Sequence, residues 1–260
     1  MKHLIATAFA LLLATAATAA TLEETIDKTF DVKPGANLVL TNVNGRVTVS
    51  AWDQPRVHVI ATKKVEADRD DVQAAMRELR VDLQPRDGGL VVTTHYPKRG
   101  ENGGLLDWLF GDNVEAQVRY EVMVPRSMNV EVTNTNGRIE LTGVSGRHEL
   151  GTTNGAIEVT RCAGSLDAST TNGSVRAELT SVALNQPLHL ETTNGRIELA
   201  VPRNFGADVD ASTTNGSIQT DLPVLTTETG RNSLRGKING GGTRVRLRTT
   251  NGGIAIRSAS

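Results

Sequence analysis

The most constraining feature of this 260-residue chain is an Asn-Gly pair that recurs in a fixed frame. When each Asn is numbered zero, mostly apolar residues recur at positions −6, −4, +3 and +5, and threonine usually precedes the pair. This alternation predicts a half-buried strand on each side of the pair. Six copies lie in the second half of the chain and one lies far upstream. They are Asn136-Gly137, Asn154-Gly155, Asn172-Gly173, Asn194-Gly195, Asn215-Gly216, Asn251-Gly252 and, upstream, Asn44-Gly45.

The spacing of the copies favours stacked coils over isolated hairpins. From Asn136 onward, successive copies are 18, 18, 22, 21 and 36 residues apart. A single Asn-Gly pair is typical of a hairpin turn, but its recurrence at this spacing predicts coils whose apolar stripes lie above one another. Asn and Gly suit the corner of each coil because both tolerate a positive φ. We interpret the interval of 36 residues as two coils that have lost one marker.

The predicted fold class is all-β. We expect a single-stranded parallel β-solenoid, with coils of about 18 to 22 residues, and a small α+β N-terminal cap that contains one helix. The chain is accordingly divided into a signal peptide at 1–20, N-terminal strands and an α+β cap region at 21–124, and β-solenoid repeats at 125–260.

The cap region departs from the repeat. A helix is expected from about Asp70, its N-cap, to Leu79, with an apolar stripe at Val72, Ala75, Met76 and Leu79. A hairpin turn is expected at 86–89. Alternating residues predict strands at 56–65, 81–83, 90–94 and 116–124. Such a cap would protect the first coil from edge-to-edge pairing.

Composition limits the kind of core and of partner. Aromatic residues make up only 3% of the chain, so small aliphatic and β-branched side chains must fill a narrow core. The single cysteine, Cys162, has no partner in the chain, which excludes a disulfide scaffold. With 28 basic and 29 acidic residues, the net charge of −1 gives no argument for nucleic acid as a partner.

Residues 1–20 are typical of a secretory signal peptide. A basic start at Lys2 precedes an apolar run over 4–13, and Ala17 and Ala19 form the small-residue pattern that precedes cleavage. The apolar run is shorter than the roughly 20 residues of a membrane span, although an N-terminal anchor is the alternative. We expect cleavage near Ala19 or Ala20, no transmembrane segment in the mature chain, and a periplasmic or cell-surface location.

The repeated Thr-Thr-Asn-Gly-x-Ile-x-Val/Leu pattern, in a chain with this signal and N-terminal strand region, resembles the bacterial putative-adhesin family, a domain of unknown function. The resemblance covers roughly Leu38 to Ile256. It implies a repetitive β-solenoid at the cell envelope. It carries no catalytic residues onto this chain.

We predict no catalytic, cofactor-binding or metal site. The histidines that remain after cleavage are not spaced as metal ligands, and the chain contains no HExxH or CxxC motif. Cys162 lacks the sequence signature of a nucleophile and is predicted to be a packing thiol. The histidines are His58, His95, His148 and His189.

A polysaccharide-active enzyme is the main rival hypothesis, because parallel β-helices also carry lyases and hydrolases. Acids recur at the outward position +4 and would stack as a ladder of the kind that such enzymes need. Arg138 and Arg196, at position +2, lie on the same face, so we favour a solvated face whose charges pair. The acids are Glu140, Glu158 and Glu198.

Two segments are candidates for binding. Arg244, Arg246 and Arg248 form one outward stripe that either binds phosphate or anionic envelope polymers or, as we favour, keeps a charged last strand from stacking end to end. The other candidate is an apolar loop that either folds back on the cap, which is slightly favoured, or contacts a partner or membrane surface. Its apolar residues are Leu105, Leu106, Trp108, Leu109 and Phe110.

The expected function is that of an exported, non-enzymatic β-solenoid, an adhesin-like binding or scaffolding module of the bacterial cell envelope. Its expected partner is an envelope polymer or protein, and no cofactor is expected. The alternatives are an accessory protein of envelope-stress signalling and, less favoured, a polysaccharide-active β-helix enzyme.

Overall fold

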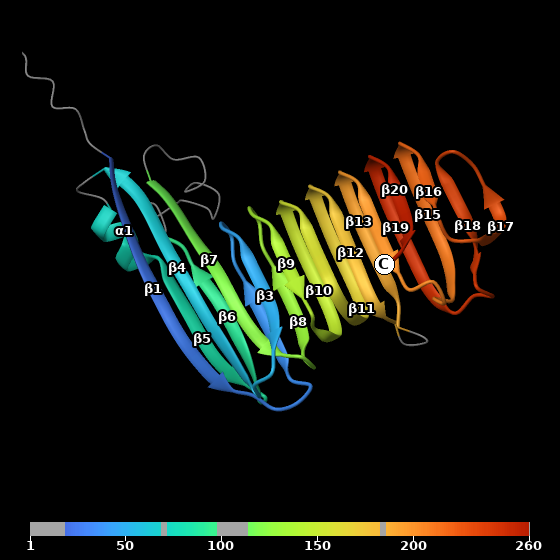
Figure 1. Ribbon diagram of the computed structural model, residues 1–260. Coiled ribbons are helices and arrows are strands. Elements are labelled where there is room, and N and C mark those ends of the chain that lie inside the picture. Colours follow the sequence, from blue (N-terminus) through green and yellow to red (C-terminus); the bar gives the residue numbers. More distant parts are fainter. Residues whose placement is uncertain (1–18, 69–71, 98–113, 183–185, 260) are drawn as a thin grey trace, which may run out of the picture.

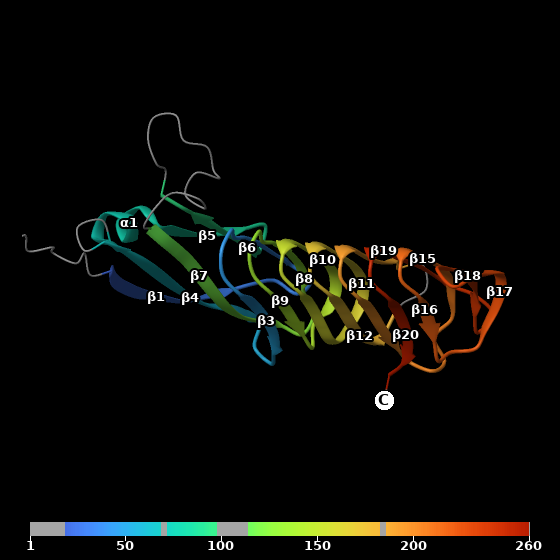
Figure 2. The ribbon, with the colours of Figure 1, turned by 90° about the horizontal axis from the view of Figure 1, so that it is seen from above.

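The protein is an elongated rod made of two layers of strands (Figures 1 and 2). Its computed structural model describes residues 19–68, 72–97, 114–182 and 186–259. Within these ranges the chain is all-β apart from one helix, α1 (Val72–Glu78). Each coil places one strand in the first layer and the next strand in the second layer, and the Asn-Gly pair forms the corner between them.

Strand pairing fixes the order of the elements along the rod. In the first layer the order is β5 (Arg80–Arg86), β6 (Gly89–His95), β2 (Asn37–Thr41), β8 (Asn129–Thr133), β10 (Ser145–Asn154), the end of β11 (Ile157–Asn172), β13 (Leu188–Asn194), β19 (Thr243–Asn251), β15 (Ala207–Asn215), β18 (Ser233–Ile238) and β17 (Val224–Thr229). In the second layer it is β1 (Ala19–Asp31), β4 (Arg56–Asp68), β7 (Val114–Pro125), β3 (Val47–Trp52), β9 (Ile139–Thr142), the start of β11, β12 (Val175–Ser181), β14 (Ile197–Val201), β20 (Ile254–Ser258) and β16 (Ile218–Thr220).

The prediction of a parallel solenoid holds only for the stacked coils. Strands pair in parallel from β6 to β15 in the first layer and from β7 to β16 in the second. At the two ends of the rod the pairs β1–β4, β4–β7, β5–β6, β15–β18 and β17–β18 are antiparallel. The sheet is therefore mixed. Of these antiparallel pairs, β5–β6 and β17–β18 are hairpins with short connections, and the others join strands that are distant along the chain.

The order of the coils in space differs from their order in the sequence. The coil of β2 and β3 lies between β6–β7 and β8–β9, so Asn44 bridges directly to Asn136 rather than standing apart. The coil of β19 and β20 lies between β13–β14 and β15–β16. Our interpretation of the 36-residue interval was wrong: it contains the hairpin β17–β18, which extends the first layer, and not a coil that has lost its marker.

A ladder of asparagine side chains follows the rod through six coils. From the second coil of the ladder onward, the Nδ2 of each Asn donates to the Oδ1 of the Asn in the preceding coil along the rod, at 2.7 or 2.8 Å. Because the coils are stacked out of sequence order, Asn251 lies between Asn194 and Asn215. In spatial order the ladder contains Asn136, Asn154, Asn172, Asn194, Asn251 and Asn215.

Each pair needs a glycine because the backbone of the neighbouring coil lies too close to leave room for a Cβ, and not only because of the φ angle. A Cβ placed on Gly173 would overlap the carbonyl oxygen of Gly155, and one on Gly155 would overlap that of Gly137. The same overlap with the neighbouring coil recurs at Gly45, Gly137, Gly195, Gly216 and Gly252. Of these seven glycines only Gly45, Gly137 and Gly252 have a left-handed φ, and the paired asparagines have none. Our explanation by positive φ was therefore incomplete.

The side chain at position −2 donates a hydrogen bond to a backbone carbonyl at the corner of the neighbouring coil. Thr192 is 2% exposed, and its Oγ1 donates to the carbonyl of Gly173 at 2.8 Å. In the coils of β2–β3 and β8–β9 this position is an asparagine: Asn42 Nδ2 donates to the Val118 carbonyl at 3.1 Å, and Asn134 Nδ2 donates to the Gly45 carbonyl at 2.8 Å. Threonine at this position does the same in the other coils, as Thr152, Thr170, Thr213 and Thr249.

The N-terminal end of the rod is closed by α1. Val72, Ala75, Met76 and Leu79 are buried, as the predicted stripe requires, while Asp70 lies outside the described residues. The predicted strands and the turn at 86–89 are also present. Lys63 of β4 is 6% exposed, and its Nζ donates to the carbonyl of Leu79 at 3.2 Å and pairs with Glu24 of β1 at 2.7 Å. This lysine ties the end of the helix to the edge strand.

We predict that Gly173→Ala lowers the free energy of unfolding by about 1–3 kcal/mol, because the new Cβ must displace the Gly155 backbone. Gly151→Ala is the matched control, since a Cβ there would meet only Ser169 Oγ at 3.9 Å. We expect its stability to stay within about 0.5 kcal/mol of the unchanged chain. Urea denaturation measures both, and equal losses in the two variants would contradict the close-approach argument.

Candidate functional site: a basic groove near the C-terminal end

The arginine stripe lies on β19, an internal strand. Arg244, Arg246 and Arg248 alternate with the buried Val245 and Leu247, so all three point outward from the first layer. However, β19 pairs with β13 on one side and β15 on the other. The favoured interpretation of a charged last strand was therefore wrong, because the stripe does not guard an edge of the sheet.

Acids on β15 face the stripe. Asp210 pairs with Arg248 at 3.3 Å and with Arg235 of β18 at 3.6 Å. Asp208 accepts hydrogen bonds from the Lys237 Nζ at 2.8 Å and from the Gly242 backbone N–H at 3.2 Å. These two donors, the lysine first, lower the pKa of Asp208 from its ordinary value. Each acid thus holds basic side chains in place.

Strands β15, β18 and β19 line an open groove of about 320 Å³. Arg244 and Arg246 are exposed, and neither side chain makes a hydrogen bond or an ion pair shorter than 4 Å within the part of the chain that the structure describes. Arg244 lies opposite Asp208, and its charge contributes to the lowered pKa of that acid. The groove therefore presents two exposed arginines without a direct salt bridge, beside a framework of paired charges. Its lining includes Asp208, Asp210, Thr227, Arg235, Lys237, Arg244 and Arg246. Such a surface can bind phosphate, sulfate or carboxylate groups.

Sequence reasoning found the three arginines but missed Arg235 and Lys237 as members of the same surface. Both lie on β18, which pairs with β15 in antiparallel register: Asp210 is opposite Arg235, and Asp208 is opposite Lys237. No short-range pattern indicated this, because the groove depends on β18 and β19 flanking the same strand.

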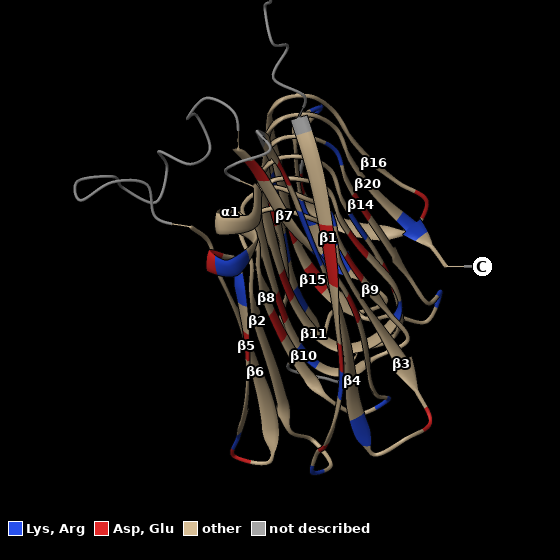
Figure 3. Cartoon of the chain, turned by 90° about the vertical axis from the view of Figure 1, so that its left-hand side faces the viewer, with Lys and Arg blue, Asp and Glu red and all other residues tan. Residues whose placement is uncertain are grey.

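The acid ladder on the second layer is ion-paired. Glu158 pairs with Arg138 at 3.4 Å, and Glu198 pairs with Arg176 at 3.2 Å. Glu140 is 3.7 Å from Arg138. Acidic and basic residues are interspersed over both layers (Figure 3). The expected pairing holds for Arg138, whereas Glu198 pairs with Arg176 and Arg257 and not with Arg196.

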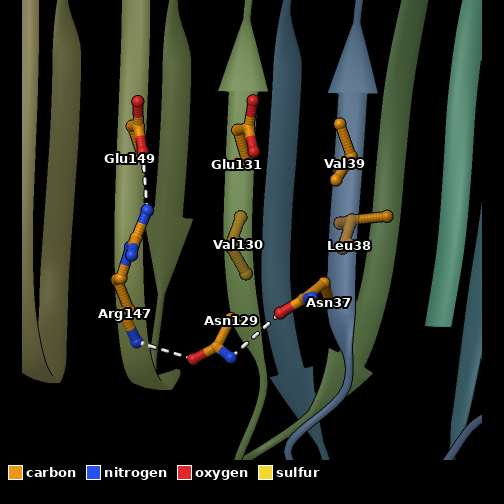
Figure 4. Close-up of a pocket in the computed structure, with 8 residues that line it drawn as sticks. All are labelled: Asn37, Leu38, Val39, Asn129, Val130, Glu131, Arg147 and Glu149. Atoms are coloured by element: carbon orange, nitrogen blue, oxygen red, sulfur yellow. Dashed lines mark hydrogen bonds and ion pairs between the residues drawn. The ribbon is translucent and has the colours of Figure 1, made fainter. Parts of the chain in front are cut away.

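A second groove, of about 210 Å³, crosses β2, β8 and β10 (Figure 4). Its polar groups satisfy one another: Asn129 donates to Asn37 Oδ1 at 2.9 Å and accepts from the Arg147 backbone N–H at 2.9 Å. The Arg147 side chain pairs with Glu149 at 3.3 Å. With its arginine already paired, this groove is a weaker candidate than the basic groove.

The histidines occupy separate places. His58, which stacks on Trp52, contacts Asp27 at 2.7 Å. His148 is buried, and burial lowers its pKa. His95 and His189 contact Asp82 and Glu191. Within the described ranges there is no group of three or more potential metal-ligating side chains.

The remaining candidates are the lone cysteine and the apolar loop. Cys162 is fully buried, and its Sγ lies 3.6 Å from the Leu141 carbonyl oxygen and 3.5 Å from that of Thr160. The loop with Leu105, Leu106, Trp108, Leu109 and Phe110 lies outside the described residues, as do residues 1–18 of the expected signal peptide.

The fold and the groove define a class of all-β proteins built from stacked coils, with a candidate binding surface and no assigned catalytic centre. The chain belongs to the Toastrack DUF4097 family, whose model matches residues 36–257. This membership agrees with the domain of unknown function that the repeat pattern indicated. No curated protein matches the sequence.

Two solved structures are similar to the chain at low sequence identity. A putative cell adhesion protein from Clostridium sporogenes is 11% identical, with a TM-score of 0.49, and the match covers 91% of this chain and 100% of that one. A putative adhesin from Bacteroides fragilis is 12% identical, with a TM-score of 0.38, and the match covers 91% and 97%. No helix in the described ranges has the length and apolarity of a membrane span.

We predict that Cys162 reacts with a disulfide reagent at pH 8 at least a hundredfold more slowly in the folded chain than in urea. Burial raises the pKa of its thiol and excludes the reagent. The control is Cys162→Ala with Thr153→Cys, which places a thiol at an exposed position. Rapid reaction of Cys162 in the folded chain would contradict a packing role.

Proposed function

We propose that this chain is an exported, non-enzymatic binding or scaffolding module of the bacterial cell envelope, and that its basic groove binds the anionic groups of an envelope polymer. The observation that carries the proposal is the pair Arg244 and Arg246, which are exposed and make no direct salt bridge although they lie beside Lys237 and Arg235. Guanidinium groups bind phosphate and carboxylate oxygens through paired N–H donors.

The groove suits a repeating anion better than a single one. It is open, so each contact is partly screened by water and contributes about 0.2–1 kcal/mol. A polymer with several anionic groups can add such contacts along the layer without paying the full association cost for each. The flanking Asp208 and Asp210 limit the net positive charge and orient the basic side chains. We therefore propose binding that depends strongly on salt.

A non-enzymatic role is supported by the state of the outward acids. A glycoside hydrolase needs two carboxyl groups that face a sugar bond, one as acid and the other as base or nucleophile. Here Glu158 and Glu198 are engaged with Arg138 and Arg176. Freeing them would mean breaking the pairing that runs along the second layer.

The binding experiment compares two double variants that remove the same charge. Arg244→Gln with Arg246→Gln should weaken binding to inorganic polyphosphate or polygalacturonate about tenfold at low ionic strength, from two lost contacts of about 0.7 kcal/mol each. Arg46→Gln with Arg196→Gln, on the second layer, should change it less than twofold. Isothermal titration with each polymer distinguishes phosphate from carboxylate recognition. An equal loss in both variants would show unspecific charge attraction, and no loss in either would refute the groove.

Export has its own test. We expect the secreted chain to begin at Ala20 or Thr21, because β1 starts at Ala19 and cleavage there leaves its pairing with β4 almost intact. Intact-mass spectrometry of the periplasmic and culture fractions measures the new N-terminus. Ala19→Arg should prevent cleavage by removing the small residue. A chain that stays in the cytoplasm at full mass would contradict export.

A further inference from the structure

The C-terminal coil, β19 and β20, is built into the rod as an internal layer although it is the last part of the chain. Its strands lie between those of two coils that precede it in sequence (Figures 1 and 2). On one side Asn251 donates to Asn194 at 2.7 Å, and Thr249 donates to the Gly195 carbonyl at 3.0 Å. On the other side Asn215 donates to Asn251 at 2.8 Å.

Through its strand pairing, this coil joins the end of the rod to the coils that precede it. The terminal module, residues 207–238, contains β15 to β18. Among the described strands, β15 pairs only with β18 and β19, and β16 pairs only with β20. The module thus forms no ladder with β13 or β14. Without β19 and β20, a slot one coil wide separates it from the rest.

The connection that leads into the coil is short and conformationally unusual. It runs from the end of β18 to the start of β19, past β15, which lies between them. All four of its residues have a positive φ: Asn239 at 48°, Gly240 at 85°, Gly241 at 93° and Gly242 at 143°. Asp208 accepts from the Gly242 N–H and so holds the end of this hinge. The glycines allow the tight return, and they also allow an extended path.

We propose that the C-terminal coil is exchangeable: β19 and β20 of a second copy of this chain fill the slot, and the two copies form a reciprocal, domain-swapped dimer. Every pairing of β19 and β20 is then reproduced between copies, and only residues 239–242 change conformation. The swap is favoured by high protein concentration and by any change that prevents the tight return. This inference rests on strand order and is independent of anion binding.

The main experiment changes the length of the hinge in the full chain. Deleting Gly240 and Gly241 leaves too short a connection to pass β15, so we expect a dimer by light scattering after size exclusion. Inserting two glycines at the same place is the matched control and should leave a monomer. A folded monomer after the deletion would overturn the proposal.

A disulfide identifies which copy supplies the coil. Ser212 of β15 faces Arg248 of β19 in register, so Ser212→Cys with Arg248→Cys, in a Cys162→Ala background, places two thiols on neighbouring strands. In the swapped dimer the bond joins two chains and survives as a dimer on a denaturing, non-reducing gel. A dimer in solution that separates into single chains on that gel would overturn the swap, since it would be held by another surface.

If the deletion variant does not fold, the same cysteine pair is tested with the natural hinge. The chain is unfolded, refolded at concentrations from micromolar to millimolar, and then oxidised. A fraction of interchain bonds that rises with concentration supports exchange of the coil. Only intrachain bonds at every concentration would overturn it.

Discussion

The structure depends on the close contact of each corner glycine with a backbone carbonyl of the neighbouring coil, which belongs to a glycine in every case but that of Gly45, where it belongs to Val118. A side chain at Gly155 or Gly173 would separate the coils, and the threonine or asparagine at position −2 then could not reach the carbonyl. This contact aligns the backbones at one point in every coil. The asparagine ladder and the apolar rows follow from that alignment, because strands in register place the same positions of the repeat side by side. Aromatic rings are scarce because the space between layers suits aliphatic side chains.

Fixed register also determines where charges meet. Residues at equal positions of neighbouring coils lie next to one another whatever their distance in sequence. Asp210 lies opposite Arg235 of one neighbouring strand and Arg246 of the other. It pairs with Arg235 and, diagonally, with Arg248, while Arg246 lines the groove without a direct salt bridge. On the second layer Glu158 lies opposite Glu140 and pairs diagonally with Arg138 of the same neighbouring coil. We assign binding to the groove because it brings Arg244 and Arg246 together with Arg235 and Lys237.

Prediction from the sequence succeeded where the signal was local. Alternation identified the inward residues of the coils, and the stripe of Val72, Ala75 and Met76 identified the buried side of α1. It failed where the outcome depended on neighbours distant in sequence. The arginine stripe was assigned to a last strand because its residues come last in the chain, but β19 is internal. Arg235 and Lys237 were missed for the same reason.

The sequence by itself determined the unit of this protein: two strands, a corner at Asn-Gly, and which side chains face inward. These follow from side-chain alternation and from the steric needs of one turn. Only the tertiary structure decided the order of the units. Every coil offers nearly the same ladder of asparagine, threonine and glycine to the next, so a distant coil stacks as well as an adjacent one. The antiparallel strands at each end and the lengths of the connections then determine which coils become neighbours.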